Sequence, residues 1–110
     1  MASTYKVLGQ AALTAETDTD VYTVPAATSA VVSTIVIANR DSSANTFRIA
    51  VRPNGATIAN EHYLAFDVPI AANDSTTLTL GLTVDAADVI TVYGGASSAL
   101  SVNIFGSEIS

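Results

Sequence analysis

The stretch that decides the fold reads Thr46-Phe47-Arg48-Ile49-Ala50-Val51-Arg52. In an extended chain, successive side chains point to opposite faces. Phe47, Ile49 and Val51 therefore share one face. The residues that alternate with them, including Arg48 and Arg52, share the other face. This two-residue period predicts a β-strand that is buried on one side.

Alternation of the same kind marks three further segments. Thr77–Val84 alternates leucine or valine with threonine or glycine. In Leu100–Phe105, the aromatic Phe105 falls on the face opposite the aliphatic residues. In the third segment, His62–Val68, one face of the strand is expected to carry His62, Leu64, Phe66 and Val68. Each segment is expected to be a strand with one buried face.

Other segments complete the set of expected strands. Ala30–Ala38 is apolar on both faces, which is typical of a central strand. Weaker strands fit Tyr5–Ala12, Asp20–Val24 and Asp88–Tyr93, where β-branched residues are common. One turn of helix is the most that Thr57–His62 is expected to form.

Turn residues separate these strands at five places. They are Pro25-Ala26-Ala27, Asp41-Ser42-Ser43, Pro53-Asn54-Gly55, Asn73-Asp74 and Gly94-Gly95. Many short, regularly spaced strands predict a sandwich or a barrel. We expect an all-β, single-domain β-sandwich of about eight strands over residues 1–110. A jelly-roll arrangement is the first choice, and an immunoglobulin-like sandwich is the alternative.

The composition excludes several classes of partner. The chain has 110 residues and a net charge of −6, with four lysines and arginines in total. Nucleic acids and anionic membrane surfaces attract basic proteins, so neither is an expected partner. The longest apolar run, near Val31–Ala38, is too short to span a membrane. The first residues do not have the pattern of a signal peptide, so we expect a soluble protein made in a cytoplasm.

Few residues could carry chemistry. His62 lies beside Glu61, but no Gly-x-Ser-x-Gly turn presents a serine to it, so a position at a strand start or a subunit contact is favoured. Asp18 with Asp20, and Asp85 with Asp88, could supply oxygen ligands to calcium; the favoured alternative is that they cap turns. No spacing singles out a carboxylate pair for glycoside hydrolysis. We expect no catalytic residue, no cofactor and no metal site.

One charged feature stands out. Three of the four basic residues lie within Arg40–Arg52, and Arg48 and Arg52 project from the same strand face. Arginine suits contacts with carboxylates of a neighbouring subunit, because its planar fork pairs with them in a bidentate manner. The alternative is a solvated face with local ion pairs, which contribute little to stability.

Three segments carry a resemblance to a known group of proteins. Tyr22–Asn39, Thr46–Val51 and Asn103–Ile109 resemble parts of small virion proteins of tailed bacteriophages, and the likeness runs over most of the chain from Tyr5 onward. That group includes capsid decoration (cement) proteins and small tail or fibre components. The resemblance implies β-sandwich subunits, often trimeric, that attach to a shell or a tail. It implies no catalytic residues.

We therefore expect a non-enzymatic virion structural protein, most specifically a capsid decoration protein that binds and stabilises the outer shell. Its expected partners are the major capsid protein or other virion proteins, and further copies of itself, with a trimer as the expected oligomer. The alternatives are a tail, neck, baseplate or fibre component, or a carbohydrate-binding adhesin module. Expected contacts lie on the first strand, the arginine face and the Pro53–Glu61 loop, at Tyr5, Arg48, Arg52, Asn54, Glu61 and His62.

Overall fold

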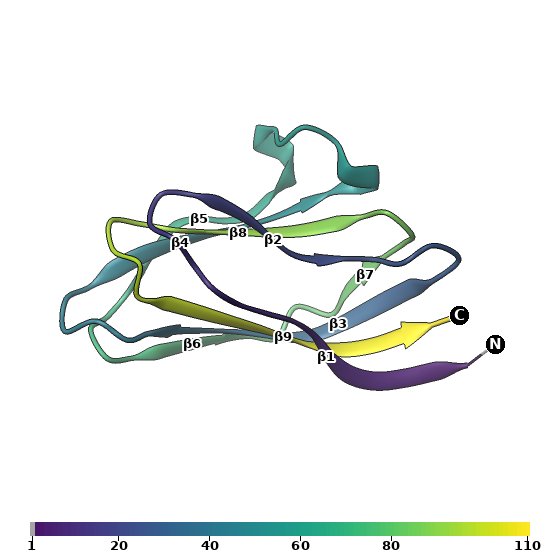
Figure 1. Ribbon diagram of the computed structural model, residues 1–110, viewed down its shortest axis with the longest axis horizontal. Coiled ribbons are helices and arrows are strands. Elements are labelled where there is room, and N and C mark those ends of the chain that lie inside the picture. The colour runs from purple at the N-terminus through teal and green to yellow at the C-terminus, as the bar shows by residue number, and fades with distance from the viewer. Residues whose placement is uncertain (1) are drawn as a thin grey trace.

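Nine strands and two short 3-10 helices form the chain in a computed structural model that describes residues 2–110 (Figure 1). The strands are β1 (Ser3–Ala12), β2 (Asp18–Thr23), β3 (Ser29–Asn39), β4 (Asn45–Arg52), β5 (Tyr63–Ile70), β6 (Ser75–Leu78), β7 (Leu82–Val84), β8 (Val89–Gly94) and β9 (Leu100–Ile109). The 3-10 helices η1 (Pro53–Gly55) and η2 (Asn60–His62) lie in the connection from β4 to β5. The second of these falls within the segment predicted to form one helical turn.

Two antiparallel sheets pack face to face, as the two layers in Figure 1 show. Sheet A has the order β1-β9-β3-β6, with β7 also paired to β3, and sheet B has the order β2-β8-β4-β5. If β6 and β7 count as one interrupted strand, the first strand pairs with the eighth, the second with the seventh, the third with the sixth and the fourth with the fifth. This pairing is that of a long hairpin rolled into a sandwich, which is the jelly roll.

The predicted β-sandwich is thus confirmed, and the strand order favours the jelly roll over the immunoglobulin-like alternative. An immunoglobulin sheet pairs its first two strands with each other. Here β1 pairs with β9, and β2 pairs with β8 in the other sheet. The prediction of one strand over Thr77–Val84 is wrong in detail, because the chain leaves the sheet between β6 and β7. Gly81 there adopts a φ of 61°, a left-handed conformation that interrupts a strand.

The core lies between the sheets and consists mainly of aliphatic side chains. Phe47 on β4 is its one fully buried aromatic residue within the described part of the chain, and Ile49 follows it on the same face. The predicted inward face of this strand is therefore confirmed. β3 is a central strand, as predicted, but only one of its faces is buried. Ile35 is inaccessible to solvent, whereas Val31 on the other face is exposed.

Candidate interaction surfaces

The outer face of sheet B carries an aromatic group built around Arg48. The Arg48 guanidinium carbon lies 4.1 Å from the ring centroid of Phe66 and 4.3 Å from that of Tyr93. Tyr63 meets Phe66 edge to face, with 4.9 Å between the ring centroids. Arg48 also donates two hydrogen bonds to the Asp67 carboxylate, at 2.6 and 3.3 Å. We call these five residues the Arg48 cluster.

A β-bulge in β5 creates this cluster. Along β4, Phe47 pairs with Val68 and Ile49 pairs with Ala65, so Phe66 and Asp67 together stand opposite Arg48. The extra residue is accommodated because Asp67 takes a φ of 51°, which aspartate tolerates better than most residues. Such a bulge re-aims the side chains around it.

The bulge also explains why one sequence prediction is wrong. Leu64 and Phe66 were expected to share a buried face with Val68. The change of register separates them, so Val68 packs against the core while Leu64 and Phe66 are 47% and 53% exposed. Apolar side chains do alternate along this strand, but the period of two is interrupted at Asp67.

Contacts with Asp67 stabilise the positive charge of Arg48. The hydrogen bonds that it donates to Asp67 raise the pKa of Arg48 above its ordinary value, and partial burial opposes that effect. The guanidinium therefore stays positive and presents a cation between two aromatic rings, an arrangement that is attractive electrostatically. Arginine and aromatic side chains are also the residue types that contribute most to protein interfaces.

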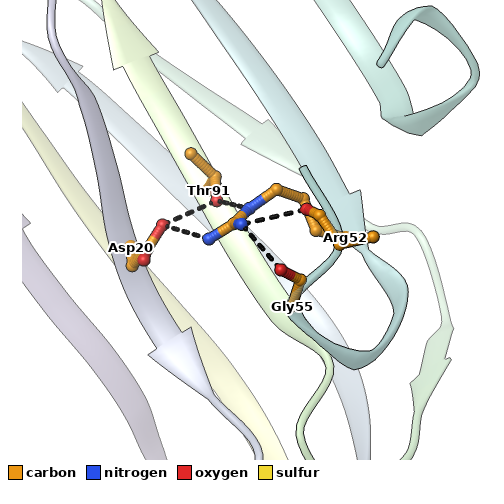
Figure 2. A network of polar contacts seen from close by, with 5 residues as sticks. Asp20, Arg52, Gly55 and Thr91 are labelled. Carbon is orange, nitrogen blue, oxygen red and sulfur yellow. Dashed lines mark hydrogen bonds and ion pairs between the residues drawn. The ribbon is translucent and has the colours of Figure 1, made fainter. Parts of the chain in front are cut away.

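Arg52, four residues further along β4, has a different environment (Figure 2). Its guanidinium donates to Thr91 Oγ1 at 3.0 Å, to Asp20 Oδ1 at 2.8 Å and to the carbonyl oxygens of Gly55 and Ala56 at 3.2 and 3.0 Å. Thr91 in turn donates to Asp20 at 2.9 Å. These contacts join β2, β8, β4 and the η1 turn, and we call them the Arg52 network.

The Arg52 network holds the β4–β5 connection over sheet B. Thr57 and Ile58 of that connection line a hollow together with Asp20, Arg52 and Thr91. Ala50, which shares the outward face of β4, is buried, although the sequence predicted it to lie on the solvent side. Arg48 and Arg52 project from one face as predicted, and both already form ion pairs within the chain. Their predicted contact with a neighbouring subunit stays a prediction.

Three further predicted contact residues lie in or beside the β4–β5 connection. Asn54 is exposed in η1, and its backbone N–H donates to Asp88 Oδ1 at 2.8 Å. Glu61 is exposed in η2. His62 Nδ1 accepts a hydrogen bond from the backbone N–H of Ala59 at 3.0 Å, so the imidazole closes the η2 turn. These residues share the side of the molecule that bears Arg52.

Tyr5, the sixth predicted contact residue, lies on the opposite sheet. It is 86% exposed on the outer face of sheet A, beside an open hollow of about 520 Å³. Val7 on β1, Val31 on β3 and Phe105 on β9 line this hollow and are themselves exposed. Sequence alternation placed Phe105 opposite the core residues of β9, and that signal identifies Phe105 as a residue of the outer face.

The charged residues of sheet A project to its inner side. Lys6 Nζ lies 3.0 Å from Glu108 Oε1, and Tyr22 of β2 donates its hydroxyl hydrogen to Glu108 Oε2 at 2.7 Å. Burial, followed by the hydrogen bond to Glu108, raises the pKa of Tyr22 well above its ordinary value. The hydrogen bonds from Tyr22 and Lys6 lower the pKa of Glu108. This group ties the ends of β1 and β9 to sheet B.

Three of the four aspartates considered as calcium ligands, Asp20, Asp85 and Asp88, have other partners. Asp88 accepts hydrogen bonds from the backbone N–H groups of Asn54 and Asp85, both at 2.8 Å, which supports a capping role. Asp20 belongs to the Arg52 network. Within residues 2–110, no three His, Cys, Asp or Glu side chains gather as a metal site, and no helix has the length and apolarity to cross a membrane.

Within residues 2–110, the buried polar groups of the sandwich interior are used within the fold. Throughout the described chain, every buried side-chain nitrogen or oxygen atom has a hydrogen-bond partner. The candidate sites are therefore the two outer faces. Comparison of the chain with protein-family models, with curated proteins and with solved structures gives no match.

Proposed function

We propose that this chain is a non-enzymatic virion structural protein of a tailed bacteriophage, most specifically a capsid decoration protein that binds the major capsid protein. The observation that carries the proposal is the Arg48 cluster. Its fixed cation, the exposed ring of Phe66 and the partly exposed rings of Tyr63 and Tyr93 form a contact surface that lies on strands β4, β5 and β8 rather than on a loop. The resemblance of Tyr22–Asn39 and Asn103–Ile109 to phage virion proteins supplies the biological setting.

The fold suits such a role physically. Antiparallel ladders run through both sheets, so a contact surface on β4 and β5 is already ordered before binding. Pre-ordering lowers the entropic cost of association. A decoration protein binds at many equivalent positions on a shell, and copies that also contact one another strengthen each other's attachment. In this proposal the chain acts in the virion, after synthesis in the cytoplasm of the host.

The copy number of the chain in purified virions tests this proposal. Quantitative mass spectrometry of particles of the virus that encodes the chain is expected to give a ratio to the major capsid protein of the order of one to one or one to a few. A ratio similar to that of the tail proteins would instead support the alternative of a tail, neck, baseplate or fibre component. Absence of the chain from the particles would overturn both.

The gathering of Tyr63, Phe66 and Tyr93 favours one second candidate, a carbohydrate-binding adhesin module. Tyr63 and Phe66 lie on β5 and Tyr93 lies on β8, and the rings of Phe66 and Tyr93 come together because both pack on Arg48. Exposed rings beside a carboxylate and a guanidinium could stack against a sugar and hydrogen bond to its hydroxyl groups. A glycan array tests this candidate, because an adhesin is expected to bind at least one glycan and to lose it in Phe66→Ala.

A further inference from the structure

The hollow on the outer face of sheet A is shaped by two bulges at the same level. β1 is irregular between Val7 and Gly9, and β3 is irregular between Val32 and Thr34. Both irregularities stand opposite the same short part of β9, around Phe105. Bulges increase local twist and bending. Their position on both sides of Phe105 accounts for a concave region on a sheet that would otherwise be evenly twisted.

Gly106 allows the strands to approach closely at this point. A Cβ atom at position 106 would collide with the backbone carbonyl of Val31 on the neighbouring strand. The hollow therefore depends on backbone geometry that the sequence specifies locally. Tyr5 projects beside it as the most exposed large apolar side chain of the described residues. One face thus carries both a protruding ring and an apolar recess.

The charges favour a second copy as the occupant. The chain carries a net charge of −6, so two copies repel each other over most approaches. The strands of sheet A, all within the described residues, contain only Lys6 and Glu108 as charged residues, and both project inward. Arg40, just beyond β3, reaches Ser101 at the other end of the sheet. Asp85 and Asp88, beyond β7, line an adjoining hollow that also includes Val31, so two copies avoid bringing like charges together where they meet around Tyr5, Val7 and Phe105.

The size of the face is adequate for a stable contact. β1 and β9 have ten residues each and β3 has eleven, so these strands run for about 33–36 Å. Four neighbouring strands span about 19 Å, which gives a flat projection of roughly 600 Å². Specific interfaces bury about 600–1,000 Å² on each partner. A contact that covers nearly the whole face would therefore reach the lower end of this range.

We propose that the outer face of sheet A is a self-association surface, on which Tyr5 of one copy inserts into the hollow lined by Val7, Val31 and Phe105 of another. If each of two copies inserts its Tyr5 into the hollow of the other, the contact is reciprocal and gives a dimer. If each copy inserts its Tyr5 into the hollow of the next copy, the contacts are head to tail and close a ring such as a trimer. The inference goes beyond the proposed function, because it holds whatever larger surface the assembled protein binds.

Measurement of the molar mass of the purified full chain in solution tests the inference. Light scattering after size exclusion is expected to give a multiple of the 11.2 kDa monomer mass. Val7→Glu introduces a negative charge into the hollow and is expected to weaken self-association at least about tenfold, so that the variant elutes as a monomer. Tyr5→Glu is expected to act in the same way. Both positions are exposed, so circular dichroism and thermal unfolding should show an intact fold.

Leu64→Glu is the matched control. Leu64 is as exposed as Val7, 47% against 45%, but it lies on sheet B. The inference expects this variant to assemble like the wild type. It is overturned if the wild-type chain stays monomeric at every concentration, or if Leu64→Glu dissociates the assembly while Val7→Glu does not. Neither result depends on capsids, so failure here is distinguishable from failure of the proposed function.

Discussion

The outer faces of the two sheets differ in charge and in what covers them. Strands β2, β4 and β5 of sheet B carry three aspartates and two arginines, and the β4–β5 connection covers part of that face. The strands of sheet A place no charged side chain on their outer face within the described residues, and nothing within the described chain covers the hollow beside Tyr5.

This difference suggests a division of roles. A neutral face with a recess suits contact between identical acidic subunits, because it avoids the repulsion of like charges. A face with fixed charges and aromatic rings suits a different protein, because complementary charges confer specificity. The two arginines on the outer face of β4 also differ in their contacts. Arg48 packs between the exposed ring of Phe66 and the partly buried ring of Tyr93, whereas Arg52 holds the β4–β5 connection in place.

The largest effect on sheet A is expected from Gly106→Ala. The added methyl group would collide with the β3 backbone, so β3 and β9 must move apart. We expect the free energy of unfolding to fall by about 1–3 kcal/mol, the usual cost of overpacking, and self-association to be lost. Urea unfolding and molar mass in solution measure both quantities.

Gly81→Asn serves as the control for this prediction. No atom lies within 4 Å of a Cβ placed at Gly81, and asparagine tolerates the left-handed conformation that this position adopts. The free energy of unfolding should fall by less than about 1 kcal/mol, because only the left-handed backbone opposes the substitution. Equal losses from the two substitutions would contradict the account of the hollow.

A smaller effect is expected when Arg52 is replaced on sheet B. Its side chain is only 17% exposed and donates to four acceptors, which a lysine ammonium group cannot satisfy together. Arg52→Lys should therefore lower the free energy of unfolding by about 1–2 kcal/mol. Arg48 donates only two side-chain hydrogen bonds, both to the half-exposed Asp67 carboxylate, so Arg48→Lys should cost less than about 1 kcal/mol. A larger loss from Arg48→Lys in urea unfolding would reverse the roles assigned to the two residues.

Much of the fold could be predicted from local patterns. Alternation in Thr46–Arg52 and Leu100–Phe105 identified both the strands and their buried faces, because burial on one side imposes a period of two. The break between β6 and β7 was missed, since Leu78, Leu80, Leu82 and Val84 continue the period through Gly81, where the chain leaves the sheet.

The candidate surfaces were less predictable, because they depend on pairing between distant strands. The Arg48 cluster depends on the bulge at Asp67, and no pattern within His62–Val68 predicts that change of register. The partner of Arg52 is Asp20, 32 residues away in sequence and on a different strand. Tyr5 and Phe105 were each assignable to an outward position, but their proximity follows only from the pairing of β1 with β9.

Cosedimentation with capsids that lack this protein tests the central claim most directly. The wild-type chain should pellet with the capsids up to a fixed ratio, and Phe66→Glu should stay largely in the supernatant because it places a carboxylate beside Asp67 and removes a ring from the Arg48 cluster. Phe66 is 53% exposed, so the variant should remain folded. A wild-type chain that stays in the supernatant, or a Phe66→Glu variant that pellets like the wild type, would contradict the assignment of this face to the shell.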